Sequence, residues 1–209
     1  MKSGYLFWKR IPVLMMVLML TACTGVTKSD DHTKEEALEA EATSPDSTVA
    51  DAIETRPAVE NFELLTSEGN HSLEAALQHG KGYSLYVFEN FTFDAAKGRL
   101  SMSNNLGYYV DIEVLPSDYD LEQLEIIGEE ELSQFGVMQN YSGELVEHPL
   151  VFADLYLQVS GEEGISDYIV WKSEAGDAFL FRLHNPKGEE ASDFAGPVLI
   201  SLSTVQSES

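Results

Sequence analysis

The sequence predicts an α+β domain, in which an antiparallel β-sheet carries two main helices, after an N-terminal region of different composition. Most segments beyond residue 60 alternate apolar and polar residues, which is the period of a β-strand. Turns rich in glycine and asparagine separate these segments, and only two longer stretches have helical spacing. Residues 61–209 hold 18 of the 21 aromatic residues, so we expect a single core there.

Five strands are expected in the first half of this domain. The first two are joined by Ser-Glu-Gly-Asn, which favours a hairpin, although the second could also form a short helix. The third follows Gly80-Lys81-Gly82 and has a strong strand pattern. The five strands are Asn61–Thr66, Ser72–His79, Tyr83–Phe88, Arg99–Ser103 and Tyr108–Leu115.

The residues after Pro116 predict the first helix. Ser117 is the expected N-cap, because its hydroxyl can accept a hydrogen bond from a free backbone N–H, and acidic residues follow in the first turn. Gly136 is the residue expected just beyond the helix end. The apolar positions with helical spacing are Leu121, Leu124, Ile127 or Gly128, Leu132 and Phe135.

Three further strands and a second helix complete the expected order. The strands are Val151–Ser160, Tyr168–Lys172 and Ala178–His184, separated by turns that contain glycine and glutamate. The second helix is expected from about Glu189 to Thr204. Gly196-Pro197 predicts a kink or a later start in this helix, because proline lacks the backbone N–H and clashes with the preceding turn.

The first 23 residues have the three parts of a secretion signal. Three basic residues precede the apolar run Ile11–Leu20, which is far shorter than the roughly 20 residues that span a bilayer. The run ends in Leu20, Thr21, Ala22 and Cys23, which resembles the lipobox of bacterial lipoproteins. This resemblance implies that residues 1–22 are removed and that Cys23 receives a diacylglyceryl group. The alternative is a signal-anchor with an incidental cysteine.

Residues 23–60 are expected to be the lipidated N-terminus and a disordered acidic tether. Residues 24–60 contain 3 basic and 10 acidic residues, a net charge of −7, and lack aromatic residues. Two acyl chains suffice for stable membrane anchoring. We therefore expect the protein on the outer face of the bacterial cytoplasmic membrane, with residues 61–209 as its single extracytoplasmic domain.

Part of the domain resembles PsbP-like domains, a family named after an extrinsic subunit of photosystem II. The resemblance lies in the Tyr-Ser-Leu-Tyr-Val strand after a glycine turn and in the terminal Leu-Ile-Ser-Leu-Ser-Thr-Val. The latter follows a strand that contains Phe179 and Phe181. Over about residues 80–205, the resemblance implies an α/β/α sandwich. It implies no catalytic residue, because the family shares no catalytic motif.

The charge and the cysteine content exclude several classes of function. Residues 61–209 contain 6 basic and 26 acidic residues, a net charge of −20. This charge disfavours binding to nucleic acid, and also electrostatic adhesion to anionic lipid. Cys23 is the single cysteine of the chain, so neither an internal disulfide nor a cysteine-based zinc site is expected.

The motifs of catalysis and metal binding are incomplete. Gly82-Tyr83-Ser84 begins like a nucleophile elbow but lacks the second glycine. The five histidines form no metal-binding pair by spacing. Part of an EF-hand pattern occurs at Asp118, Asp120, Glu122 and Glu129, but position 6 is glutamine where the loop needs glycine. We therefore expect no catalytic residue, no metal and no cofactor.

The best functional lead in the sequence is a set of aromatic residues on strands that are apolar on both faces. They are Tyr86, Phe88, Phe152 and Tyr156. Either such strands are central and covered on both sides, or these rings form an exposed surface for a partner. We expect a non-enzymatic interaction module that binds an envelope protein. The alternatives are a module that binds a small ligand or peptide and, last, a hydrolase without a recognisable motif.

Overall fold

The computed structural model of the chain describes residues 56–66, 69–143, 149–150 and 152–208. The expected signal sequence, Cys23 and most of the expected tether lie outside the described residues. The first strand begins at Val59, and the Arg56 side chain is already packed on the domain. The described part of the domain therefore includes about five residues that precede the change in composition.

The strands form two antiparallel sheets within the described part of the chain. The four-stranded sheet has the spatial order β1 (Val59–Thr66), β2 (Gly69–His79), β3 (Tyr83–Phe88) and β11 (Gln206–Ser207). The seven-stranded sheet has the order β4 (Phe91–Asp94), β5 (Arg99–Met102), β6 (Tyr109–Val114), β10 (Ala178–Pro186), β9 (Gly164–Lys172), β8 (Leu155–Ser160) and β7 (Met138–Asn140).

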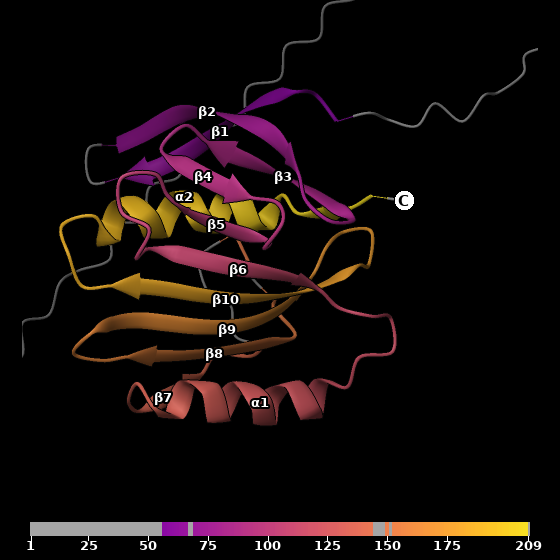
Figure 1. Ribbon diagram of the computed structural model, residues 1–209, viewed down its shortest axis with the longest axis vertical. Coiled ribbons are helices and arrows are strands. Elements are labelled where there is room, and N and C mark those ends of the chain that lie inside the picture. Colours follow the sequence, from indigo (N-terminus) through magenta and orange to yellow (C-terminus); the bar gives the residue numbers. More distant parts are fainter. Residues whose placement is uncertain (1–55, 67–68, 144–148, 151, 209) are drawn as a thin grey trace, which may run out of the picture. The chain divides into compact units, whose positions relative to one another are not determined.

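Two helices cover opposite faces of the seven-stranded sheet. Helix α1 (Leu121–Ser133) packs on β8 and β9, and α2 (Ala191–Ser203) packs between β10 and the four-stranded sheet (Figure 1). The alternation along β9 explains this arrangement, because Tyr168 and Val170 belong to the core beneath α1, whereas Ile169 belongs to the core beneath α2. Both faces of β9 are therefore buried.

Strand β3 is buried along its whole length because each of its faces meets a different layer. On one face, the Tyr83 ring packs edge-on against Phe179 of β10 at a centroid distance of 6.1 Å. On the other face, Tyr86 and Phe88 pack on Phe62 of β1 at 5.5 and 5.9 Å. The seven-stranded sheet therefore covers one face of β3, and α2 contacts β3 on the face that it shares with Phe62.

The structure confirms the α+β class and corrects several details. The expected single sheet is two sheets, and β4, β7 and β11 were not predicted. The first helix begins at Leu121, and its N-cap is Asp120, whose Oδ1 accepts from Gln123 N at 3.1 Å, rather than Ser117. Helix α2 continues through Pro197, so no late start occurs there. Residues 69–79 form a strand, as the hairpin alternative predicted.

Candidate functional site

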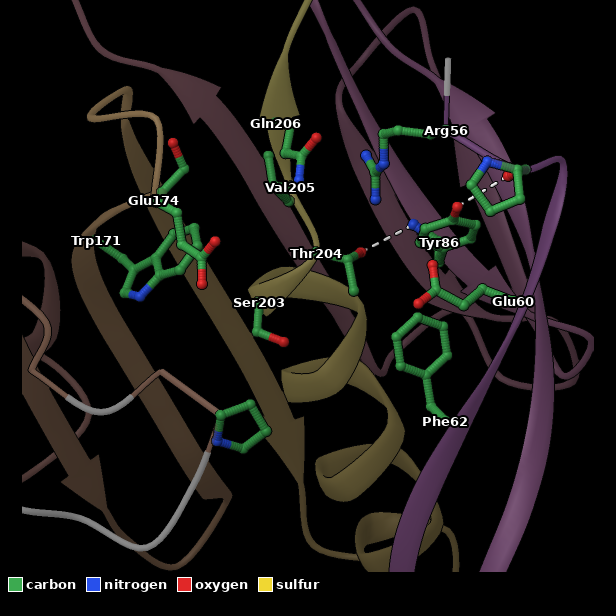
Figure 2. Close-up of a pocket in the computed structure, with 13 residues that line it drawn as sticks. Arg56, Glu60, Phe62, Tyr86, Trp171, Glu174, Ser203, Thr204, Val205 and Gln206 are labelled. Atoms are coloured by element: carbon green, nitrogen blue, oxygen red, sulfur yellow. Dashed lines mark hydrogen bonds between the residues drawn. The ribbon is translucent and has the colours of Figure 1, made fainter. Parts of the chain in front are cut away.

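A cavity of about 600 Å³ lies at the C-terminal end of α2, beside β1 (Figure 2). We call it the β1–α2 cavity. Its side chains come from segments that are far apart in the sequence: Glu60 and Phe62 of β1, Tyr86 of β3, Trp171 and Glu174 near the end of β9, and Ser203 and Thr204 at the end of α2. The cavity thus combines aromatic walls, two carboxylates, the Arg56 guanidinium and the hydroxyl groups of serine and threonine side chains.

The period of β1 places Glu60, Phe62 and Leu64 on the face that looks toward α2. Phe62 and Glu60 line the β1–α2 cavity, while Leu64 contacts the helix near Gly196, where an added Cβ would lie 3.0 Å from Leu64 Cδ1. The glycine thus lets the strand and the helix approach closely. One face of β1 therefore both packs on α2 and shapes the cavity.

Tyr86 joins the wall of the cavity to the start of the domain. Its backbone N–H donates to Thr204 Oγ1 at 2.9 Å, and its hydroxyl donates to the Pro57 carbonyl at 2.8 Å (Figure 2). The Arg56 guanidinium lies over the Tyr86 ring at 4.5 Å and donates to the carbonyl and the hydroxyl of Ser84 at 3.2 and 3.0 Å. These contacts fix both β1 and the end of α2 against β3.

Three charged side chains line the β1–α2 cavity, which are the carboxylates of Glu60 and Glu174 and the guanidinium of Arg56. Glu60 and Glu174 are exposed carboxylates at the cavity, whereas the Arg56 guanidinium is held by Ser84 and Tyr86. Burial raises the pKa of the Tyr86 hydroxyl, and the hydrogen bond and charge of Glu60 act in the same direction. The Arg56 guanidinium already lies over the Tyr86 ring, and Trp171, which is half-buried, adds a ring that attracts cations.

A second cavity, of about 720 Å³, lies at the N-terminal end of α2. We call it the apolar cavity, because Leu64, Leu73, Met102 and Pro197 line it, together with asparagine and serine side chains and one carboxylate, that of Asp193. Leu73 is 36% exposed, which shows that part of this apolar surface faces solvent. An apolar cavity with a few polar groups is the usual form of a small-ligand site.

The four aromatic residues singled out in the sequence do not form a common exposed surface. Tyr86, Phe88 and Tyr156 are 2, 2 and 6% exposed, so their rings belong to the core. Phe152 is 63% exposed, and its φ of 61° is unusual for a bulky residue. The patch hypothesis is corrected for three of the four rings, and of those three only Tyr86 lines one of the two cavities described above.

Asp167 is a buried carboxyl group in β9. It is 5% exposed, and Gln158 Nε2 donates to its Oδ1 at 2.8 Å. Burial raises the pKa of Asp167 to about 7, and the Gln158 hydrogen bond offsets only part of this effect. A shifted carboxyl group is a feature of many active sites, so its neighbours decide whether it could act in catalysis.

The neighbours of Asp167 do not support a Ser–His–Asp arrangement. Ser166 Oγ lies 3.3 Å from His184 Nδ1 on the adjacent strand. Successive side chains of a strand point to opposite faces, so Asp167 faces away from this pair and cannot orient the imidazole. Among the described residues, no group of three or more His, Cys, Asp or Glu side chains could hold a metal ion.

The fold and the cavities define an α+β domain of two antiparallel sheets with a cavity at each end of α2. The chain belongs to the family described as a domain of unknown function (DUF8580), whose model matches residues 56–206. No curated protein matches the chain. None of the helices in the described ranges is long and apolar enough to cross a membrane.

Sequence reasoning did not find Glu60, Phe62, Trp171 or Glu174 as neighbours in a cavity. The alternation of Val59–Leu64 gives a local signal that places Glu60 and Phe62 on one face of a strand. No pattern in the sequence brings that face to the end of β9. The cavity arises from the packing of two sheets on one helix, which is a non-local property.

Proposed function

We propose that the protein is a lipid-anchored, extracytoplasmic interaction module of the bacterial cell envelope, and that it binds a protein partner at the β1–α2 cavity without catalysis. The observation that carries the proposal is the cavity itself, which joins ring faces, carboxylates and hydroxyl groups beside a strand edge. Aromatic residues in pockets are the side chains that dominate binding energy at interfaces.

The anchoring part of the proposal rests on Cys23 and the residues before it. Leu20, Thr21 and Ala22 resemble the recognition sequence of lipoprotein signal peptidase, and Cys23 is the single cysteine. The proposed location is the outer face of the cytoplasmic membrane. The PsbP-like resemblance is proposed for the layer order alone, supported by α1 and α2 on opposite faces of one sheet; the four-stranded sheet was not expected from it.

Photo-crosslinking in cells tests the proposal. A benzophenone amino acid replaces Ser203, whose side chain lines the β1–α2 cavity and is half-buried. We expect one dominant adduct with an envelope protein, because the probe lies where the partner binds. The same probe at Glu122, which is exposed on α1, is the matched control and should give no such adduct.

The Cys23→Ala variant of the Ser203 probe strain separates anchoring from binding. We expect the adduct to weaken strongly, because the unanchored protein loses the high local concentration at the membrane. Equal adducts from Ser203 and Glu122, or none from Ser203, would contradict the binding part of the proposal. An undiminished adduct in the Cys23→Ala strain would contradict the anchoring part.

The apolar cavity supports a second candidate function, which is the binding of a small apolar ligand. Its volume of about 720 Å³ lies within the range of about 300–1,000 Å³ for such sites. The same probe at Ser192, on the margin of this cavity, distinguishes the two functions. A low-mass adduct on the protein from Ser192, with none from Ser203, would favour the small-ligand function.

A further inference from the structure

The free edge of β1 is the feature that carries this inference. Strand β1 has eight residues and lies at the edge of the four-stranded sheet, because β2 is its one partner among the described strands. The other edge strands are short: β11, β7 and β4 have two, three and four residues. Proteins commonly shorten edge strands to prevent unwanted pairing, so the long edge of β1 stands out.

The hydrogen-bond register shows which backbone groups of β1 face this edge. Leu77 N donates to the Ala58 carbonyl at 2.9 Å, and Val59 and Asn61 lie opposite Ala76 and Glu74 of β2. In an antiparallel pair, alternate residues exchange hydrogen bonds with the partner strand and the residues between them point away. The N–H and C=O groups of Val59, Asn61 and Glu63 therefore point to the free edge, and no described residue pairs with them.

The β1–α2 cavity lies on the face that an added strand would share with β1. Residues opposite each other in a sheet point to the same face, so the inward side chains of an added strand would lie beside Glu60 and Phe62. In Figure 2, these two side chains and Trp171 stand on opposite sides of the end of α2. The free edge would hold the backbone of a bound segment, and the cavity would take a side chain.

The charges indicate the side chain that fits the cavity. Glu60, Glu174 and the Arg56 guanidinium line it, so carboxylates outnumber cations by two to one, and the Arg56 guanidinium is already bonded to Ser84. Glu63 lies on the opposite face of β1. Residues 56–209 contain 7 basic and 27 acidic residues, a net charge of −20, so the whole domain attracts basic segments. The same charge opposes pairing with a second copy. It also opposes pairing with the acidic residues 24–55 of this chain, which have 2 basic and 9 acidic residues.

We infer that the partner binds as an extended peptide segment that adds a strand to the free edge of β1 and places a lysine or arginine side chain in the β1–α2 cavity. The backbone groups of Val59, Asn61 and Glu63 give affinity, and Glu60, Glu174 and the aromatic walls select the basic residue. This inference rests on the proposed function and names the class of its ligand.

A synthetic peptide tests the inference directly. The probe is fluorescently labelled Thr-Val-Thr-Lys-Thr-Val-Thr with blocked ends, in which valine and lysine share one face and the threonines share the other. Its binding to the full chain in detergent is measured by fluorescence anisotropy. The sequence is symmetric about lysine, so the test does not depend on strand direction. A peptide with glutamate in place of lysine should bind at least about tenfold more weakly.

Two changes to the backbone distinguish strand addition from other modes of binding. Asn61→Pro removes one N–H at the free edge, where proline is tolerated, and should weaken binding about tenfold while the unfolding temperature stays nearly constant. Asn61→Ala keeps that N–H and should bind like the unaltered protein.

N-methylation of the peptide gives the second test. One peptide is N-methylated at its threonines, and another at its valines and lysine. These two sets of N–H groups point to opposite edges of the peptide, and only one edge pairs with β1. One of the two peptides should therefore lose binding, and the other should keep it.

The outcomes separate the inference from the proposed function. Equal binding of the lysine and glutamate peptides, loss of binding for both N-methylated sets or for neither, or unchanged binding by Asn61→Pro would overturn the inference. If the Ser203 adduct then persists, the proposed function stands with a ligand of another shape. If Ser203 gives no adduct in cells, the proposed function itself fails, whatever the peptide does.

Discussion

The ionisation of the Asp167 carboxyl group is strongly linked to the folding of the domain. Its carboxyl group is nearly excluded from water, and burial raises its pKa to about 7, against about 3.9 in an unfolded chain. Between these two values the native state holds a proton that the unfolded state has lost. The free energy of unfolding therefore falls as pH rises through this window, and the contribution of Asp167 is constant above it.

Asp167→Asn should remove this pH dependence. The free energy of unfolding of the variant, minus that of the unaltered protein, should rise by about 3 kcal/mol from pH 5 to pH 8. The reason is that the amide does not ionise and can still accept from Gln158. Urea unfolding followed by circular dichroism measures this difference. The range begins at pH 5 because the sequence pI is about 4.3.

Asp118→Asn is the matched control, because Asp118 is exposed. This change should alter the unfolding free energy by less than about 0.5 kcal/mol at either pH. If Asp167→Asn and the unaltered protein had parallel pH profiles, Asp167 would be ionised in the native state at pH 5, and the burial argument would be wrong.

At the scale of single residues, the sequence predicts which side chains are apolar but not which layer covers them. Tyr86 and Phe88 alternate with Leu85 and Val87, so their strand is apolar on both faces. This pattern favours a central strand that is covered on both faces, but it also fits an exposed aromatic surface. The contact of Phe62 with Tyr86 at 5.5 Å decides between them, and it joins residues 24 positions apart in the chain.

Helix α1 docks on the seven-stranded sheet through a glycine. An added Cβ at Gly128 would lie 2.7 Å from Tyr168 Cδ1 and 2.9 Å from Leu157 Cδ1, both of which belong to buried side chains. Glycine within a helix costs about 1 kcal/mol relative to alanine. Close packing of the helix on Tyr168 and Leu157 accounts for glycine at this position.

Gly128→Ala should destabilise the domain although it raises helix propensity. We expect a net loss of about 1–2 kcal/mol, because overpacking against a dense core costs about 1–3 kcal/mol and the gain in propensity offsets about 1 kcal/mol. Thermal and urea unfolding measure the effect. Glu129→Ala, at the next and exposed position, is the control and should be nearly neutral. A more stable Gly128→Ala variant would show that α1 does not depend on this close approach.

At the scale of elements, local patterns predict strands well and their partners poorly. Tyr83–Phe88 is predicted with its exact bounds, because alternation and the flanking glycines are local signals. The short strand β4 was missed although Phe91 and Phe93 alternate and Asp94 Oδ1 accepts from the N–H groups of Ala96 and Lys97 in a turn. Strand β11 has two residues and pairs with β3, so no local signal could have indicated it.

The charge of the whole domain acts on stability as well as on binding. Residues 56–209 have a net charge of −20, and their carboxylates repel one another in the compact state. Helix α1 concentrates part of this charge, because Glu129 and Glu130 lie near its C-terminal end, which has no basic residue in its last turn. Negative charge there opposes the helix dipole. Sequence alone predicts this effect, since net charge does not depend on the fold.

Salt should therefore stabilise the domain. Raising NaCl from about 0.02 M to 1 M shortens the screening length to about 3 Å, and we expect the unfolding temperature to rise.

The Glu129→Gln/Glu130→Gln variant should have a free energy of unfolding about 0.5–2 kcal/mol higher than that of the unaltered protein at low salt. At 1 M NaCl the two proteins should differ little, because salt screens the same repulsion that the variant removes. Calorimetry at both salt concentrations measures the two effects together. A lower unfolding temperature in 1 M NaCl than in dilute buffer would show that repulsion among the carboxylates does not limit stability. The net charge would then matter for the choice of partner alone.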